Sequence, residues 1–210
     1  MAEVNIPGAG VMMDWSVATR PIAGQSVSGD LYLVKPFKNR ILAAVIDGVG
    51  HGDEAAEAAR QAMEIMDIHA AEPVISLVKR CHDALLRTRG VVLTVAKLDT
   101  VENTMTWLGV GNVEGRLWRA DAGASHPRES VLLRGGLVGY QLPALQASVI
   151  PVAAGDLLIL ATDGIHPSFE DGVNRNETPR QIADEIMSRH FKGNDDALVL
   201  VVRYLGAPHE

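Results

Sequence analysis

The sequence predicts an α+β protein in four layers, with two central antiparallel sheets packed together and helices flanking them on the outside. The expected order is strands, two helices, many strands, one helix and a last strand, unlike the strict alternation of a parallel βαβ fold. Glycine and proline separate the short apolar runs of the second half, as turns do in antiparallel sheets. Hydrophobic residues make up 47% of the chain and aromatic residues only 4%, so aliphatic side chains must fill this core.

The first half of the chain contains predicted strands followed by two helices. The strands are expected at 12–19, 31–34 and 40–46, and the last two form a hairpin that turns near 36–39. Alanine and other apolar residues at helical spacing predict helices at 53–70 and 73–87. Pro73 suits the first turn of the second helix, where its missing N–H has no intrahelical partner in any case.

The second half begins after Gly90, which breaks the helical pattern. Short apolar runs predict strands at 91–98, 105–110, 113–118, 130–133, 146–150, 156–161 and 197–204. An amphipathic pattern predicts one helix at 178–190, directly before the last strand.

Length and charge limit the classes of function. A chain of 210 residues suits one domain, so residues 1–210 are expected to form a single catalytic domain and a monomer. The net charge of −7 disfavours a nucleic-acid partner and binding to an anionic membrane surface. The single cysteine, Cys81, fits a reducing compartment, and we expect a cytoplasmic protein without a signal peptide or a membrane span.

The stretch 47–52, with the sequence DGVGHG, is the most informative segment. It follows an apolar run and precedes a helix, so Asp47 lies at the end of a buried strand. Glycines in this turn permit positive φ and close approach to a ligand. An Asp beside a free carbonyl offers the oxygen ligands that Mg²⁺ and Mn²⁺ prefer. The alternative is an ordinary strand-to-helix turn in which the Asp is a cap.

Other acidic residues also lie at predicted strand ends. They are Asp30 before a strand, Asp163 after one, and the pair Asp195 and Asp196 before the last strand. A single Asp-Gly is usually only a turn. Several carboxylates gathered at one edge of a sandwich would repel one another unless cations neutralise them, and a two-metal centre would do so.

Together these motifs resemble the metal-dependent PPM-type serine/threonine phosphatases, and above all the bacterial SpoIIE-like branch. The resemblance rests on SGD at 28–30, DGVGHG at 47–52, TDG at 162–164 and DD at 195–196, in the order and spacing of that family. A narrower resemblance, to the small RsbX-like phosphatases, rests on RCHDA at 80–84, RG at 89–90 and VGNV at 110–113. Members of that group are single catalytic domains that act on the stressosome, a bacterial stress-signalling assembly.

The resemblance implies roles for individual residues. Asp47 would bridge two divalent ions, Mn²⁺ or Mg²⁺, and the Gly48 carbonyl would bind one of them. Asp163 and Asp195 would complete the ligand set with waters, and Asp30 would bind directly or through water. The residues expected to carry catalysis are therefore Asp47, Asp163 and Asp195.

Neighbouring positions follow the family less closely. Asp196 would support the ligands or cap the strand, and His51 and Asn112 would lie near the site without a direct role. Larger relatives carry an Arg shortly before the first acidic residue that grips the phosphate, and here Arg20 is the nearest candidate. The Thr that usually comes shortly after the acidic pair is absent, and Ala197 and Leu198 stand there.

The implied activity is hydrolysis of phosphoserine or phosphothreonine on protein substrates. Two metals about 3.5–4 Å apart can orient a water for in-line attack and offset charge on the phosphoryl oxygens, without a covalent intermediate. The implied substrates are phosphorylated stressosome scaffold proteins with STAS domains, where the enzyme would oppose a partner kinase and reset the signal.

Three alternatives remain open. Cys81 and Arg87 match the C-x₅-R pattern of cysteine phosphatases, although a helical pattern over this segment would place them on different faces. A phosphatase fold that has lost its metals and acts as a binding module is the second, and the retained acidic residues argue against it. The third is a two-metal nuclease or nucleotide hydrolase, and the acidic composition disfavours a polynucleotide substrate.

Overall fold

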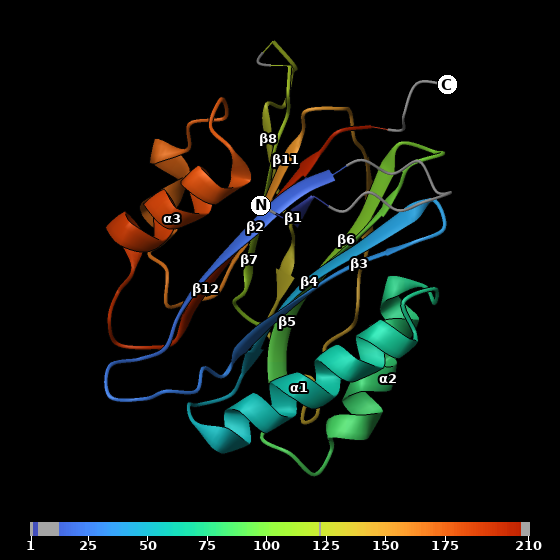
Figure 1. Cartoon of the computed structure of the whole chain (residues 1–210). Coiled ribbons are helices and arrows are strands. Elements are labelled where there is room, and N and C mark those ends of the chain that lie inside the picture. Colours follow the sequence, from blue (N-terminus) through green and yellow to red (C-terminus); the bar gives the residue numbers. More distant parts are fainter. Residues whose placement is uncertain (1, 4–12, 122, 207–210) are drawn as a thin grey trace.

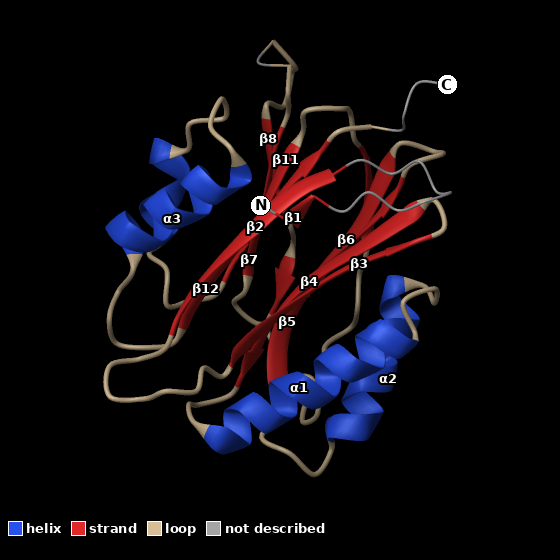
Figure 2. Cartoon of the chain, viewed as in Figure 1, coloured by secondary structure: helices blue, strands red, loops and turns tan. Residues whose placement is uncertain are grey.

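The structure is a computed structural model that describes residues 2–3, 13–121 and 123–206. Two sheets pack face to face at the centre of the molecule (Figures 1 and 2). Helices α1 (Asp53–Ile68) and α2 (Val74–Leu85) cover the outside of one sheet, and α3 (Pro179–His190) covers the other. This arrangement is the four-layer α+β sandwich predicted from the sequence.

The sheet under α1 and α2 contains the strand that ends at Asp47 and Gly48. Its order is β10-β6-β5-β4-β3, antiparallel throughout, with β9 added in parallel beside β6. These strands are β3 (Asp30–Phe37), β4 (Arg40–Gly48), β5 (Val91–Asp99), β6 (Thr104–Val110), β9 (Leu133–Arg134) and β10 (Ser148–Pro151).

The sheet under α3 contains the strands that flank the other two acidic motifs. Its order is β1-β2-β12-β11-β7-β8, and every neighbouring pair is antiparallel. These strands are β1 (Ala2–Glu3), β2 (Met13–Arg20), β7 (Glu114–Trp118), β8 (Arg128–Ser130), β11 (Leu157–Ala161) and β12 (Ala197–Tyr204).

Three apolar clusters hold the layers together, one between the sheets and one beneath the helices on each side. Small residues let α1 lie close to its sheet, because Ala58, Ala59 and Ala62 are fully buried there. Helix α3 begins with a capping box, in which Thr178 and Gln181 each bond the other's backbone N–H. Burial of each Val, Leu or Ile contributes roughly 1.5–3 kcal/mol, so these clusters supply most of the stabilisation.

The predicted elements are present, with shifted boundaries. Helices 53–70 and 73–87 each end two residues earlier than predicted, and Pro73 is the N-cap of α2 rather than part of its first turn. The hairpin strand predicted at 31–34 extends to Phe37, so its turn is shorter than expected. Residue 12, the predicted start of the first strand, lies outside the described residues.

The prediction of one strand at 130–133 is wrong, because the chain changes sheets there. Strand β8 pairs with β7 in one sheet, whereas β9 pairs with β6 in the other. Val131 crosses between them and is buried in the central core, with its N–H donated to the Gly115 carbonyl. A short 3₁₀ helix, η1 (Pro167–Gly172), was also not predicted. None of the helices in the described part of the chain is long and apolar enough to cross a membrane.

Candidate metal centre

Asp30 and Asp47 are direct neighbours across the β3–β4 hairpin. The antiparallel register pairs the two residues, so their side chains leave the same face of the sheet. Asp30 is 4% exposed. Its burial is the largest cause that raises its pKa, to about 7, and the charges of neighbouring aspartates raise it further. Burial is also the largest cause for Asp47, whose pKa rises to about 8. Two carboxylates are therefore held together where water cannot fully stabilise their charges.

Thr162 joins this pair to the opposite sheet. Its hydroxyl donates to Asp30 Oδ2 at 2.8 Å and accepts a hydrogen bond from the N–H of Leu198 at 2.8 Å. Thr162 is buried and directly follows β11. The TDG motif at 162–164 thus positions Asp30 as well as supplying Asp163, a function of Thr162 that the sequence did not indicate.

Asp163 follows Thr162 and has two polar neighbours of its own. Asn112 donates to Asp163 Oδ2 at 2.7 Å, and Lys192 Nζ donates to the Asp163 main-chain carbonyl at 2.6 Å. Burial and the charge of Asp195 raise the pKa of Asp163, while Lys192 and Asn112 oppose that rise. Asn112 thus lies at the site, as the family resemblance implied, and Lys192 is a cation at its edge that the sequence analysis missed.

Asp196 positions the loop that leads to Asp30. Its two carboxylate oxygens accept from the N–H groups of Ile22 at 2.7 Å and Gly29 at 2.6 Å. The preceding residue, Asp195, is partly exposed and accepts the Asp196 N–H at 2.9 Å. Asp196 therefore holds residues 22–29 against the start of β12, which leaves Asp195 as the member of the pair available to a ligand.

Two glycines allow these segments to meet. A Cβ on Gly48 would lie 2.1 Å from the Ala55 carbonyl oxygen, and one on Gly164 would lie 2.0 Å from the Asp196 carbonyl oxygen. Neither position has room for a side chain, because backbone atoms are the obstacle. The Gly48 carbonyl oxygen would lie 3.4 Å from a Cβ on Gly29, the residue that Asp196 binds. The Gly48 carbonyl is thus close to the group of aspartates.

The four acidic segments therefore meet at one edge of the sandwich. The pKa of Asp47 is raised by the charges of Asp30, Asp163, Asp195 and Asp196, which act on it together. Carboxylate and carbonyl oxygens are the donors that hard divalent cations take, and a cation would relieve this repulsion. The residues present therefore fit a site for divalent ions.

The ligand set is not complete in side chains alone. Among the residues that the structure describes, no three His, Cys, Asp or Glu side chains already surround one point as metal ligands. Mg²⁺ commonly keeps several waters and takes only one or two carboxylates. The Gly48 carbonyl and water would have to supply the remaining positions.

Arg20, the candidate for phosphate binding, and His51, expected near the site, both make contacts within the chain. The Arg20 guanidinium stacks over the Phe191 ring at 4.8 Å from its centre, on β2 rather than on the loop before Asp30. His51 Nδ1 lies 2.5 Å from Gln25 Nε2, so the glycine-rich turn contacts the loop that carries Asp30. Neither contact assigns a phosphate-binding role to Arg20 or His51.

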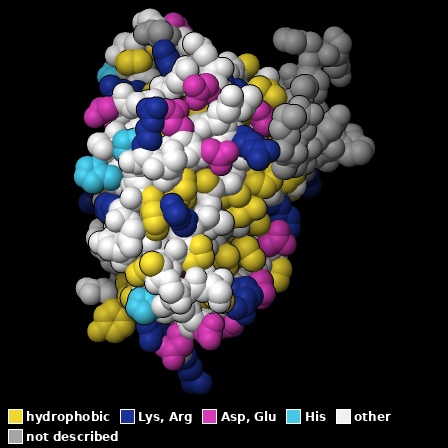
Figure 3. Space-filling model, turned by 60° about the vertical axis from the view of Figure 1, so that its left-hand side comes forward, with side chains coloured by type: hydrophobic (Ala, Val, Ile, Leu, Met, Phe, Trp, Pro, Cys, Tyr) yellow, Lys and Arg dark blue, Asp and Glu magenta, His cyan; other side chains and the backbone are white. Residues whose placement is uncertain are grey.

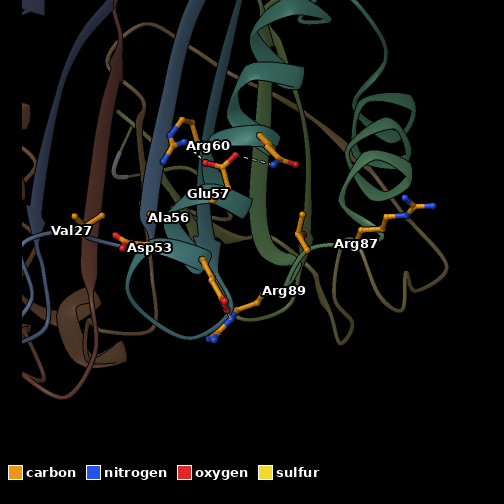
Figure 4. A pocket seen from close by; sticks show the side chains of 10 residues that line it. Val27, Asp53, Ala56, Glu57, Arg60, Arg87 and Arg89 are labelled. Atoms are coloured by element: carbon orange, nitrogen blue, oxygen red, sulfur yellow. Dashed lines mark hydrogen bonds and ion pairs between the residues drawn. The ribbon is translucent and has the colours of Figure 1, made fainter.

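A groove of about 790 Å³ lies beside the N-terminal turns of α1 (Figure 4). Its charges are largely paired within the chain, because Arg60 bonds Glu57 and Arg89 Nε lies 2.5 Å from Glu54 Oε2. Arg87 also lines the groove, on the side of α2 (Figure 4). The groove adjoins the turn after Asp47, and the sequence analysis did not predict it.

Cys81 does not have the environment of a catalytic thiol. It is fully buried in α2, and burial raises the pKa of the thiol to about 12. Its Sγ lies 3.7 Å from the Ala62 carbonyl oxygen, between the two helices. Arg87 lies beyond the end of α2 and is exposed. The C-x₅-R match is therefore a coincidence of sequence.

The sequence and the fold both match known phosphatases. The family model of Stage II sporulation protein E (SpoIIE) matches residues 38–205. Phosphoserine phosphatase RsbX of Bacillus subtilis (strain 168) is 24% identical over 174 residues, which are 82% of this chain and 85% of RsbX.

Two solved structures share the fold over most of their length. A chain of a structure described as "The bacterial stressosome: a modular system that has been adapted to control secondary messenger signaling" has a TM-score of 0.82 and 27% identity, covering 91% of this chain and 99% of its own. RsbX in complex with magnesium also has a TM-score of 0.82, at 22% identity, covering 91% of this chain and 95% of its own. The chain therefore belongs to the SpoIIE family of PPM-type (PP2C-like) serine/threonine phosphatases.

Proposed function

We propose that the chain is a single catalytic domain that uses two divalent ions, Mg²⁺ or Mn²⁺, to hydrolyse phosphoserine or phosphothreonine in proteins. The ions would be held by Asp30, Asp47, Asp163, Asp195 and the Gly48 carbonyl. One observation carries this assignment: Asp30 and Asp47 are adjacent, largely buried carboxylates, and the charges that act on the pKa of Asp47 are those of other aspartates. A site built this way is stable in ionised form only when cations enter it.

The divalent ions would supply activation of a water molecule and neutralisation of the phosphoryl oxygens. The chain's own residues prepare the site for them. Thr162 orients Asp30, Asn112 orients Asp163, and Asp196 fixes the loop before Asp30. Such supporting hydrogen bonds determine which carboxylate oxygen faces a ligand. No nucleophilic side chain is required, which is consistent with the buried state of Cys81.

The substrates we propose are phosphorylated STAS-domain proteins of a stressosome, where the enzyme would oppose a partner kinase and reset the signal. The support is the 24% identity to RsbX over most of both chains and the 27% identity to a chain from a stressosome study. The cytoplasmic location and the monomeric state expected from the sequence remain predictions.

Phosphate release from a phosphorylated STAS-domain protein tests this proposal. It would be measured with Mn²⁺, with Mg²⁺, with EDTA, and with the Asp47→Asn variant. Turnover that requires a metal and is lost in Asp47→Asn would support both the site and the substrate. Turnover of an aryl phosphate alone would retain the chemistry and reject the stressosome substrate. No turnover of either compound, with no metal retained by the purified protein, would favour a catalytically inactive binding module.

A further inference from the structure

A second pocket, lined by basic and polar side chains, lies beside the acidic centre. It has a volume of about 370 Å³ and is lined by His166, Ser168, Arg189, His190, Phe191 and Lys192. We call it the basic pocket. It is formed by the end of α3, the loop that follows α3, and the start of η1.

The basic pocket is directly connected to the metal-binding segments. Lys192 donates its N–H to the Gly164 carbonyl at 2.9 Å and its Nζ to the Asp163 carbonyl at 2.6 Å. Phe191 forms an isolated bridge with Ile165, two residues after Asp163. A molecule in the pocket would therefore lie next to the candidate metal centre, and an extended peptide advances only about 3.3 Å per residue.

The charge of the pocket is opposite to that of the chain as a whole. None of its lining residues is acidic, although the chain carries a net charge of −7. On the face shown in Figure 3, acidic and basic side chains are interspersed, so a concave group of basic residues is not the general pattern of this surface. Arg20 adds a further cation, since its guanidinium stacks on the Phe191 ring.

The hydrogen bonds of the pocket orient His166 as a donor. His166 Nδ1 accepts the Ser168 N–H at 3.2 Å, so a neutral His166 ring carries its proton on Nε2 and offers an N–H. The Ser168 hydroxyl lies 2.8 Å from His166 Nδ1 and 3.3 Å from His190 Nδ1. Among the described residues, the exposed Arg189 forms an ion pair with the partly buried Glu185 at 2.8 Å, and surface pairs of this kind are weak.

We propose that the basic pocket binds an anionic side chain, a carboxylate or a second phosphate, that flanks the target phosphoserine of the protein substrate. This inference rests on the proposed function, because it requires the phosphoserine to lie in the neighbouring centre. Arg189 and Lys192 supply the charge, the Nε2–H of His166 supplies a donor, Ser168 holds the His166 ring in place, and Phe191 forms an apolar wall. The pocket would select acidic or multiply phosphorylated segments over neutral ones.

The test compares phosphoserine peptides that differ only in their flanks: neutral Gln flanks, three Glu before the phosphoserine, three Glu after it, or a second phosphoserine. We expect kcat/KM to be about tenfold higher for one acidic peptide than for the neutral one, mainly through KM, as one charge-assisted hydrogen bond would give. The Glu and double-phosphoserine peptides distinguish a carboxylate from a phosphate as the bound group. Arg189→Gln should reduce this preference to about twofold or less.

Arg180→Gln is the matched control. Arg180 lies on the same helix, is exposed, and has an acidic partner four residues away, Asp184, just as Arg189 has Glu185. It does not line the basic pocket, so its substitution should leave the preference intact. Equal kcat/KM for all four peptides, or an unchanged preference in Arg189→Gln, would overturn the proposal.

A binding measurement separates this inference from the proposed function. Fluorescence anisotropy of the same labelled peptides would be recorded with unmodified protein, Arg189→Gln and Arg180→Gln in EDTA. Tighter binding of acidic peptides that is lost only in Arg189→Gln would support the pocket even if no peptide is hydrolysed, in which case the proposed function fails alone. Equal binding of acidic and neutral peptides would reject the pocket whatever the hydrolysis shows.

Discussion

The carboxylates at the two ends of strand β11 have opposite surroundings. Before the strand, Asp156 is 2% exposed and fully partnered: it accepts from Arg119 Nη1 at 3.2 Å, the Ala120 N–H at 2.7 Å and the Ala153 N–H at 3.0 Å. After the strand, Asp163 lies near Asp195, and its burial, followed by the charge of Asp195, raises its pKa.

Asp30 makes the contrast sharper, because it is buried about as deeply as Asp156. Its neighbours are the Thr162 hydroxyl and further carboxylates, rather than an arginine and backbone amides. A buried charge costs several kcal/mol unless it is paired. At one end of the sandwich, the chain pairs the buried charge of Asp156 with its own groups. At the other end, the buried charges would be neutralised by cations bound from solution. We therefore expect Asp156 to act in stability and Asp30 and Asp47 to act in function.

The largest effect should come from Asp47→Asn, which removes a carboxylate from the candidate metal centre. We expect turnover to fall on the order of 10²–10³-fold or more, since a charged group that would hold both ions is lost. The metal-free variant should be no less stable than the unmodified protein, because one of several repelling charges is removed. Phosphate release and denaturant unfolding in EDTA measure the two effects. A variant with full activity would exclude Asp47 from the centre.

Asp156→Ala should have nearly as large an effect, but on stability instead of activity, because Asp156 lies at the structural end of β11. Removing one partner of a buried ion pair costs about 3–5 kcal/mol, and two backbone N–H groups lose their acceptor as well. We expect the free energy of unfolding to fall by that amount, while kcat of the protein that remains folded changes by less than about threefold. Loss of metal-dependent turnover with unchanged stability would contradict the assignment.

The pH dependence of stability sharpens the comparison further. Burial and repulsion place the pKa of Asp30 at about 7 and that of Asp47 at about 8 in the metal-free fold, whereas an unfolded Asp has a pKa near 3.9. The folded state therefore holds more protons than the unfolded state between these limits. The stabilisation is complete below about pH 4 and is lost as the pH rises through 7 to 8, by up to about 1.4 kcal/mol per pH unit for each proton.

Denaturant unfolding in EDTA at several pH values from 5 to 9 measures this dependence. Asp47→Asn should flatten the curve, and added Mn²⁺ should restore stability at pH 8. Parallel curves for the variant and the unmodified protein would show that Asp47 does not titrate in this range.

The smallest effect expected is that of Asn112→Ala. The Asn112 side chain donates to Asp163 Oδ2 from the loop between β6 and β7. Loss of a hydrogen bond that orients a metal ligand typically costs about 10–100-fold in metal affinity or activity, and we expect the lower part of that range because Asn112 is exposed. Titration of activity with Mn²⁺ should show a higher half-saturating concentration at similar maximal turnover. An unchanged titration would mean that Asp163 is oriented by other contacts.

Most elements could be predicted because their signals are local. The run at 41–46 is apolar throughout because β4 is buried on both faces there, and the Ala-rich pattern after it reflects a helix packed closely on that strand. The prediction of one strand at 130–133 was wrong because these residues divide between two sheets, and no local periodicity encodes such a division. The family resemblance implied the five candidate ligands, and their role as ligands stays a prediction. The contact of Thr162 with Asp30, the contact of Lys192 with Asp163 and the basic pocket had no local signal in the sequence.

The sequence by itself determined the layered α+β fold, the strand ends that carry aspartates and the membership in a phosphatase family, because alternation, glycine turns and short motifs are properties of adjacent residues. Only the tertiary structure decided how those aspartates are supported and what surrounds them. The Thr162–Asp30 hydrogen bond joins residues 132 positions apart, and the Gly29–Asp196 hydrogen bond joins residues 167 positions apart. Contacts of this kind form only when the two sheets pack, since burial and charge depend on neighbours that are remote in the chain.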